Sequence, residues 1–177
     1  MDTDELKARQ QPLKERYRAE PEAAMITLRA EGELGVDVSC SVQTGRALVE
    51  AGLHPATGGD GSFACSGDML LQALVACAGV TMQSVATSIG IAVSGSVEAE
   101  GDLDFRGTLA VSKEALVGFR AIRLRFDITS DATDDEIATL LRLTERYCVV
   151  YQTLAGNPAL STQLTSAHSD ATGERSS

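Results

Sequence analysis

The feature that most constrains this chain is a long stretch without charge, which begins after Asp68 and ends before Glu98. Its first half is rich in Ala, Leu and Met, which are good helix formers. The apolar residues of the stretch cover nearly every face of a helix, and a helix that is apolar all round is buried on all sides. We therefore predict a buried central helix within residues 63–90, with the thiol of Cys77 at its middle.

The same stretch must be weighed as a membrane span, because about 20 apolar residues can cross a bilayer. Polar side chains interrupt it at Gln72, Thr81 and Gln83. No cluster of Lys or Arg flanks it, as the positive-inside pattern would favour. The N-terminus is charged from its second residue, unlike a secretory signal. We expect the core helix of a soluble protein and no membrane partner.

Length and charge limit the class of partner. The chain has 177 residues, which suits one domain of ordinary size with its own core. Its formal net charge is −10 and its pI is about 4.6. A nucleic-acid partner would require a basic face, so we expect no nucleic-acid binding. Four cysteines without the paired spacing of a disulfide framework indicate a reducing, cytoplasmic setting.

The sequence does not indicate a metal or cofactor site. No two cysteines have CxxC spacing, and the histidines are His54 and His168, whereas a zinc site usually needs four Cys or His ligands. The Gly-rich segment 58–61 lacks the Lys-Ser/Thr pair of a phosphate loop and does not match the dinucleotide motif. We therefore expect no metal and no cofactor, with this segment a turn and His54 a loop residue.

Around the central helix the hydrophobic period changes to two, which is typical of half-buried strands. The strands expected from this pattern lie at residues 26–30, 36–42, 93–101 and 122–128, with weaker candidates at 103–111 and 160–165. The first two would form a hairpin that turns at Gly32. The expected organisation is a charged N-terminal arm at residues 1–22, a domain at 23–166 and a disordered tail at 167–177.

A second helix is predicted to begin after Thr133, because Thr133 and Glu136 have the spacing of a capping box. Its apolar positions repeat at the spacing of one helix face. That face carries Ile137, Leu140, Leu141, Thr144 and Cys148. Cys148 is thus expected at the end of the second helix and on the side that faces the core, where it could meet Cys77.

The cysteines allow two interpretations. A buried cysteine is most often a small hydrophobe, and we expect Cys40 to be strand core. Cys77 and Cys148 on facing helices could instead form a redox pair, which would need the thiolate of Cys77 as nucleophile. Burial raises a thiol pKa, so we expect a cation, an Arg from outside the central helix, near that thiolate. Cys65 near the start of the helix is either a packed loop residue or a rival reactive thiol.

At these residues the sequence resembles the OsmC/Ohr family, which comprises osmotically inducible protein C and the organic hydroperoxide resistance proteins. The resemblance covers roughly residues 24–165 and is most specific at two cysteine segments. These are GGDGSFACSGDMLLQALVACAGVTMQSVA and RYCVVYQTL. The crossing VQTGRALVEAGLHPATGGDG is similar to the general OsmC-like subgroup.

The resemblance implies an α+β fold in which antiparallel β-sheets wrap two central helices, formed as an intertwined homodimer. It also implies a thiol peroxidase that reduces organic or small hydroperoxides. In that role Cys77 would be the peroxidatic and Cys148 the resolving cysteine, and an external dithiol would reduce their disulfide. By the same resemblance Arg46 would hold the thiolate and orient the peroxide, and Asp68 would hold Arg46.

The chain departs from the family pattern at several of these residues. Asp68 stands where Glu is usual, and nine residues separate it from Cys77, so the two would face opposite sides of a straight helix. Asp68 could simply be a favourable first-turn acid, and Arg46 a solvated loop residue. Val149 replaces the proline that is common after the second cysteine. A non-catalytic redox-sensing or hydrophobic-ligand-binding module, or a purely structural dimerisation domain, therefore stays open beside the peroxidase.

Overall fold

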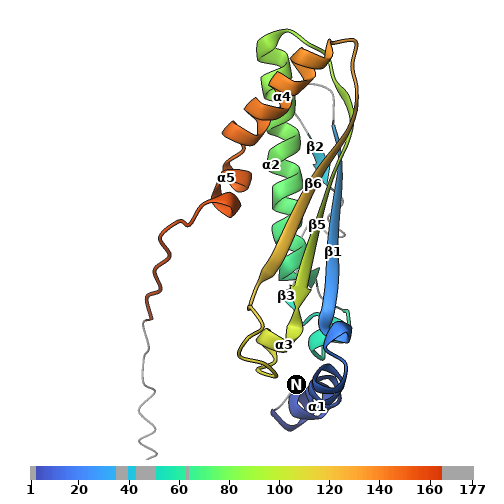
Figure 1. Cartoon of the computed structure of the whole chain (residues 1–177), viewed down its shortest axis with the longest axis vertical. Coiled ribbons are helices and arrows are strands. Elements are labelled where there is room, and N and C mark those ends of the chain that lie inside the picture. Colours follow the sequence, from blue (N-terminus) through green and yellow to red (C-terminus); the bar gives the residue numbers. More distant parts are fainter. Residues whose placement is uncertain (1–2, 35–39, 43–50, 63, 165–177) are drawn as a thin grey trace, which may run out of the picture.

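The computed structural model describes residues 3–34, 40–42, 51–62 and 64–164, arranged as a long helix against an antiparallel sheet (Figure 1). The helices are α1 (Thr3–Ala19), α2 (Ser66–Ile89), α3 (Phe105–Thr108), α4 (Asp134–Tyr147) and α5 (Val149–Ala155), with short 3-10 helices η1 (Pro21–Ala24) and η2 (Pro55–Thr57). The strands are β1 (Met25–Leu34), β2 (Cys40–Val42), β3 (Ala51–Gly52), β4 (Ala64–Cys65), β5 (Ser94–Asp104) and β6 (Phe119–Thr129).

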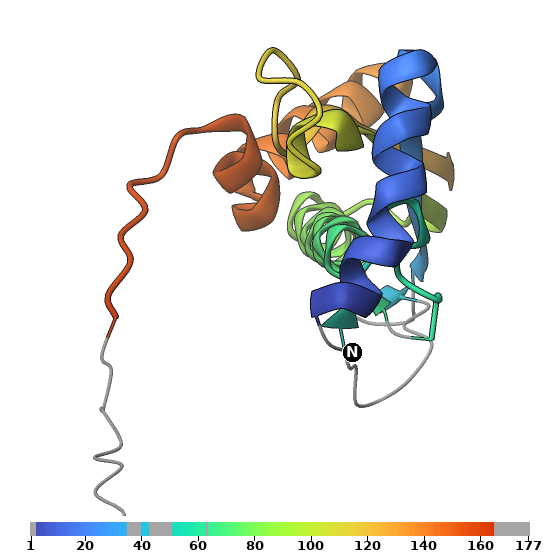
Figure 2. The same ribbon diagram turned by 90° about the horizontal axis from the view of Figure 1, so that it is seen from below.

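Four antiparallel strands form the main sheet in the order β2-β1-β5-β6, and β3 and β4 make a small parallel pair. Seen along its length in Figure 2, α2 lies beside the sheet, with α4 and α5 on another flank of α2. The α+β class expected from the sequence is confirmed. By length and composition α2 could cross a membrane, and half of its most apolar 18-residue stretch is buried inside the fold.

The central helix confirms the prediction for the charge-free stretch, with one difference. It begins after Cys65 and ends at Gly90, whose φ of +76° is a left-handed conformation that glycine adopts without strain. Nine of its residues are buried. An opposite stripe is open, however, and Leu70 and Val80 on it are each 38% exposed. Burial all round, as the sequence predicts, is therefore not reached within one chain.

The predicted hairpin exists, but its turn lies elsewhere. Gly32 is inside β1, where it pairs with Val42 of β2 and Val97 of β5. The reason is the length of β5, which holds β1 in register from Met25 to Glu33. Gly32 is therefore part of a strand rather than a turn, and the connection from β1 to β2 lies outside the described residues.

Two weaker strand candidates are wrong. Strand β5 stops at Asp104, because the side chain of Asp104 accepts a hydrogen bond from the backbone N–H of Arg106 and caps the short helix α3. Most of residues 103–111 are therefore not strand. Residues 160–164 pair with no strand in the described part of the chain, and Leu160 and Leu164 are 93% and 86% exposed.

The N-terminal arm is a helix that docks on its own chain. Helix α1 runs through Pro12, although a proline inside a helix usually kinks or breaks it. Tyr17 is 2% exposed, and its hydroxyl donates to the carbonyl of Ala56 at 2.7 Å. The Gln10 side chain donates to the carbonyl of Thr57 at 3.2 Å. These contacts fix α1 across one end of the sheet, beside η2 and α3.

The second helix begins where the capping box predicts. The hydroxyl of Thr133 accepts from the backbone N–H of Glu136, whose carboxylate in turn accepts from the backbone N–H of Thr133. Leu140 and Thr144 on the inner face are buried. Cys148 ends α4 with no exposed surface, as predicted.

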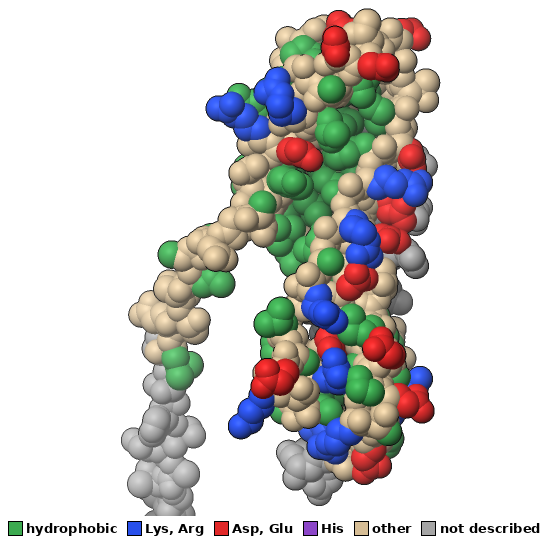
Figure 3. Space-filling model, in the orientation of Figure 1, with side chains coloured by type: hydrophobic (Ala, Val, Ile, Leu, Met, Phe, Trp, Pro, Cys, Tyr) green, Lys and Arg blue, Asp and Glu red, His purple; other side chains and the backbone are tan. Residues whose placement is uncertain are grey.

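The outer face of the sheet is charged and paired. Arg123 on β6 contacts Glu100 at 3.3 Å and Asp102 at 2.5 Å, and Arg125 contacts Glu98 at 3.9 Å. Figure 3 shows blue and red side chains side by side along this strand. Exposed pairs of this kind contribute only about 0–1 kcal/mol each. This face is therefore solvated surface, and the chemistry must be sought on the helix side.

Candidate active site

Cys77 and Cys148 meet where α2, α4 and α5 pack together. Cys148 ends α4 and is also the N-cap residue of α5, where its sulfur accepts a hydrogen bond from the backbone N–H of Tyr151 at 3.4 Å. The Cys148 thiol is hydrogen-bonded to the sulfur of Cys77. Both cysteines are free, Cys77 half-buried and Cys148 buried. The structure thus brings together the two cysteines that the sequence pairs.

The sulfur of Cys77 is surrounded by hydrogen-bond donors. Burial opposes ionisation of this thiol, but the N–H of Val150, the thiol of Cys148, the hydroxyl of Thr81 and the N–H of Val149 outweigh it. Together these donors lower the pKa of Cys77 below that of an ordinary thiol. The two amides are free to donate because they belong to the first turn of α5, whose N–H groups have no partner within the helix.

Cys148 has the opposite tendency. Burial raises the pKa of Cys148 first, and the N–H of Tyr151 offsets this in part. The hydrogen bond to Cys77 and the negative charge of the Cys77 thiolate raise the pKa of Cys148 further. The two thiols therefore ionise in a fixed order. Cys77 becomes the thiolate first, while Cys148 stays protonated and directs its S–H toward that thiolate.

The donors to Cys77 were not foreseen from the sequence, which suggested that a cation was required. Within the described residues, the groups that lower its pKa are neutral amide, thiol and hydroxyl donors. Arg46, the expected cation, lies outside the described residues. Of the missed residues, Thr81 could have been found from its i+4 spacing to Cys77. The amides of Val149 and Val150 carry no side-chain signal and depend on a helix that begins at Cys148.

Asp68 lies at the first turn of α2 and away from Cys77 of the same chain. Nine residues at about 1.5 Å each separate them by about 13.5 Å along the axis, on opposite sides of the helix. Burial raises the pKa of Asp68, and the nearby His54 lowers it in part. The backbone N–H of Ala56 donates a hydrogen bond to Nδ1 of His54 at 3.0 Å, and the His54 ring stacks on Phe105.

The remaining sequence candidates play smaller parts. Cys65 is the N-cap residue of α2, yet its side chain makes no capping hydrogen bond. Cys40 opens β2, but its side chain lies outside the described part of the chain, as do His168 and the whole of the predicted tail at 167–177. In the part of the chain that the structure describes, no three His, Cys, Asp or Glu side chains cluster as metal ligands.

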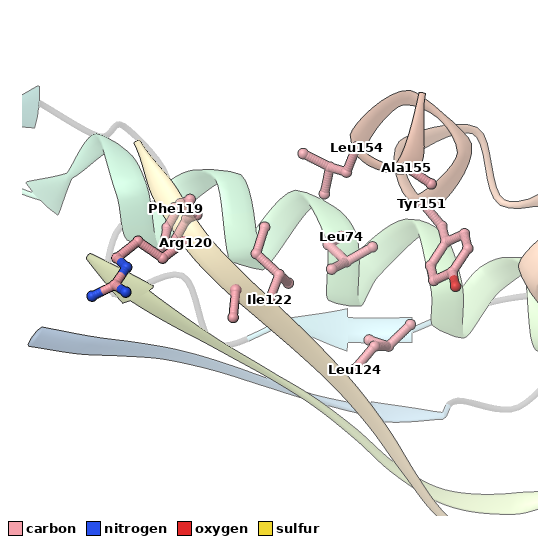
Figure 4. Close-up of a pocket in the computed structure, with 9 residues that line it drawn as sticks. Leu74, Phe119, Arg120, Ile122, Leu124, Tyr151, Leu154 and Ala155 are labelled. Atoms are coloured by element: carbon pink, nitrogen blue, oxygen red, sulfur yellow. The ribbon is translucent and has the colours of Figure 1, made fainter. Parts of the chain in front are cut away.

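A half-open pocket of about 310 Å³ lies between α2, α5 and β6 (Figure 4), and its residues Leu74 and Tyr151 belong to the same hydrophobic cluster as Cys77 and Cys148. Leu74 lies one turn before Cys77 on α2, and Tyr151 one turn after Cys148 on α5. Other lining residues are Phe119, Arg120, Ala121, Ile122, Leu124, Leu154 and Ala155. Gly101 lets the Phe119 ring lie over β5, because a Cβ at Gly101 would lie 2.3 Å from that ring. A small apolar molecule would fit next to the thiol pair.

Comparison with known proteins identifies the fold. The family model described as OsmC-like protein matches residues 59–163, which is 105 of 177 residues. A solved structure of an OsmC-like hydroperoxide resistance protein from Jannaschia sp. CCS1 superposes with a TM-score of 0.56 at 12% identity, covering 82% of this chain and 97% of that one.

A second solved structure, an OsmC-like protein from Mycoplasma pneumoniae, gives a TM-score of 0.51 at 18% identity, covering 75% of this chain and 86% of that one. Curated proteins gave no match. At these identities the two structures establish the fold alone. Because the family model matches more than half of its length, this chain belongs to the OsmC-like protein family.

Proposed function

We propose that this protein is a thiol-dependent peroxidase that reduces organic or small hydroperoxides with Cys77 and Cys148. The observation that carries the proposal is the ordered thiol pair: Cys77 has a lowered pKa, and it is hydrogen-bonded to a protonated, buried Cys148. A thiolate is the nucleophile in thiol chemistry. The solved hydroperoxide resistance protein of the same fold is consistent with this reaction class.

In the first step the Cys77 thiolate attacks the terminal oxygen of the hydroperoxide, R–O–OH. An S–O bond forms and the O–O bond breaks, which leaves Cys77 as a sulfenic acid. The leaving alkoxide, RO⁻, takes a proton from water and departs as the alcohol. The hydroperoxide is reduced by two electrons and the Cys77 sulfur is oxidised by two.

In the second step Cys148 loses its proton and its sulfur attacks the sulfur of the Cys77 sulfenic acid. An S–S bond forms, and the hydroxide that leaves combines with the proton as water. The packing of Cys77 and Cys148 in one hydrophobic cluster and the influence of the Cys148 thiol on the pKa of Cys77 support this step. An external dithiol then reduces the disulfide by exchange and is itself oxidised to a disulfide.

The pocket between α2, α5 and β6 supports an organic substrate. Its walls are mostly apolar, with Leu74, Ile122, Leu124 and Leu154 among them. Pockets that bind small molecules are typically apolar with a few polar groups, and here Tyr151 contributes a hydroxyl (Figure 4). An alkyl or aryl group could occupy this space while its peroxide oxygen reaches the sulfur of Cys77.

A homodimer is part of the proposal, and the open stripe on α2 supports it. The stripe repeats at alternating intervals of four and three residues, the period of a helix–helix seam. It comprises Ser66, Leu70, Ala73, Cys77, Val80, Ser84 and Thr87, all exposed except the half-buried Cys77. A second copy placed on this stripe would complete the burial that the sequence of α2 predicts.

The open edge of β6 also suits a second copy. This strand has 11 residues and is the outermost strand of the sheet. Long unpaired edges are normally covered in native proteins. Figure 3 shows an apolar band between β6 and the helices.

In such a dimer Asp68 and Arg46 would serve the thiolate as the family resemblance implies. Since Asp68 is about 13.5 Å along the helix from Cys77 of its own chain, it would act through Arg46 or on the cysteine of the second copy. The free thiols suit the reducing cytoplasm that we propose as its location.

A binding module is the second candidate, and the cavity is the observation that favours it. In that case the pocket would hold a hydrophobic molecule, and the cysteines would be packing or a redox sensor. Cavity and thiols share one apolar cluster, so either function would place its ligand beside Cys77.

Mass spectrometry with disulfide mapping distinguishes the two functions. We would treat the reduced protein with one equivalent of cumene hydroperoxide and compare the wild type with Cys77→Ser and, as the matched control, Cys65→Ser. A Cys77–Cys148 disulfide that forms within seconds, persists in Cys65→Ser and disappears in Cys77→Ser is the expected result. If no cysteine is rapidly oxidised in any variant, the peroxidase proposal is wrong.

A further inference from the structure

We propose that Thr81 is a further catalytic residue, whose hydroxyl holds the reacting sulfur of Cys77 by a hydrogen bond from the same helix. Thr81 follows Cys77 by four residues on α2 and is half-buried. Side chains four residues apart lie one above the other on a helix, and each leans toward the N-terminus. The Thr81 side chain therefore leans back over Cys77, where its hydroxyl can donate to the sulfur and so lower the pKa of that thiol.

The bonding of other threonines shows what is unusual about Thr81. A helical threonine commonly donates its hydroxyl to the carbonyl four residues before it. Thr87 does so to Gln83, as Thr144 does to Leu140 and Thr153 to Val149, each at 2.8 Å. The residue four before Thr81 is Cys77, and there the hydroxyl acts as a donor toward the side-chain thiol and lowers its pKa.

Apart from Thr81, no side chain one turn before or after Cys77 on α2 can offer its sulfur a hydrogen bond. In mid-helix the backbone N–H groups are engaged with carbonyls of the preceding turn, so a donor from α2 itself must be a side chain. The residues three and four before Cys77 are Leu74 and Ala73, and the residue three after it is Val80. None of these three side chains has a polar atom. Thr81 alone among these helical neighbours can hold the sulfur.

Thr81 also differs from the backbone amides of α5 in the helix that carries it. The amides of Val149 and Val150 belong to α5, the helix that begins at Cys148. When Cys148 moves to attack Cys77, those amides are directly coupled to its movement. Thr81 is attached to the helix of Cys77 itself and stays beside the sulfur. A hydroxyl both donates and accepts, so it can bond the thiolate first and the sulfenic oxygen afterwards.

The test is the rate at which iodoacetamide alkylates Cys77, measured between pH 5 and 9 on the Cys77 peptide by mass spectrometry. The variant is Thr81→Val, which keeps the branched shape and removes the hydroxyl. Thr81→Ser restores the hydroxyl, and Ser88→Ala is the control, because it deletes a hydroxyl of the same helix that donates to a carbonyl and lies off the proposed dimer stripe.

We expect Thr81→Val to alkylate Cys77 about tenfold more slowly at pH 7, the effect of one hydrogen bond to a charged group. The midpoint of its pH profile should move upward, while Thr81→Ser and Ser88→Ala should follow the wild type. Equal profiles for Thr81→Val and Ser88→Ala would overturn the assignment. If Thr81→Val does not fold by circular dichroism, Thr81→Ala takes its place with the same expectation.

The role of Thr81 as a catalytic residue rests on the proposed peroxidase, but the alkylation test does not. Iodoacetamide needs the thiolate and no peroxide. Slow alkylation in Thr81→Val together with no oxidation of the wild type by cumene hydroperoxide would reject the peroxidase and leave the hydrogen bond established. Rapid oxidation of the wild type together with unchanged alkylation in Thr81→Val would reject the role of Thr81 alone.

Discussion

Cys65 and Cys77 lie twelve residues apart on one chain segment, at the start and in the middle of α2, and their surroundings differ. Cys65 occupies the N-cap position, where the positive end of a 24-residue helix favours negative charge. Its side chain nevertheless makes no capping hydrogen bond. Cys77 lies in the middle of its helix, where the helix end exerts no such field. Four donors among the described residues nevertheless lower the pKa of its thiol.

This contrast teaches that donors aimed at the sulfur matter more than its position along a helix. Cys77 obtains its amide donors from the start of another helix, the seven-residue α5. Short-range hydrogen bonds act on the sulfur directly, whereas the field of a helix end falls off within the first turn. The middle of a buried helix can thus hold the more reactive thiol.

The largest effect that this comparison predicts is within the wild-type protein. Because donors lower the pKa of Cys77, its thiolate persists at pH values where an ordinary thiol, with a pKa of about 8.5, is protonated. We expect iodoacetamide to alkylate Cys77 at least roughly tenfold faster than Cys65 at pH 7. The ratio of the two rates should shrink as the pH rises through about 8.5, where an ordinary thiol also ionises. Peptide-resolved mass spectrometry measures both rates in one sample, and equal rates would contradict the account.

Much of the fold follows from the sequence because strong local signals and burial agree there. The charge-free stretch predicts α2, alternation predicts β6, and the Thr133–Glu136 pair marks the start of α4. The turn at Gly32 was wrong because pairing with the long β5 overrides a local turn signal. Helix α1 also continues through Pro12, and tertiary contacts of Tyr17 and Gln10 hold it in place.

The site is predictable only in part, because side-chain patterns reveal partners and not backbone donors. The helical phase of Ile137 to Cys148 placed Cys148 on the inner face, opposite Cys77. The amides of Val149 and Val150 left no trace in the sequence, since any residue except proline provides an N–H. The association of Asp68 with His54 also required the structure, because the two belong to separate elements.

The next largest effect concerns the thiol that donates to Cys77. Replacing Cys148 with alanine removes the donor, whereas replacing it with serine keeps a hydroxyl in its place. A thiol is a weak donor, so we expect Cys148→Ala to slow alkylation of Cys77 at pH 7 by about threefold to fivefold. Cys148→Ser should alkylate at least as fast as the wild type.

Both variants lack the partner for a disulfide, so they separate the two roles of Cys148. With cumene hydroperoxide each should stop at the sulfenic acid of Cys77, which dimedone traps. If both variants alkylate Cys77 at the rate of the wild type, the Cys148 thiol gives the Cys77 thiolate no support.

The smallest predicted effect isolates one backbone amide. Val149 is the first residue of α5 and its side chain is 72% exposed, so its replacement removes little packing. Proline is tolerated at the first position of a helix, and it needs an extended residue before it. Cys148 is extended, with φ −71° and ψ 109°. Val149→Pro should therefore fold normally while removing one N–H donor from the sulfur of Cys77.

Because this N–H is the weakest of the four donors to Cys77, we expect Val149→Pro to slow alkylation of Cys77 only about twofold at pH 7, the effect of roughly 0.5 kcal/mol. Val149→Ala, which keeps the N–H and loses the same exposed side chain, is the control and should match the wild type. Slower alkylation of Cys77 in both variants would show that the effect comes from loss of the Val149 side chain. No fall in Val149→Pro would leave Val150 as the amide of α5 that supports the thiolate.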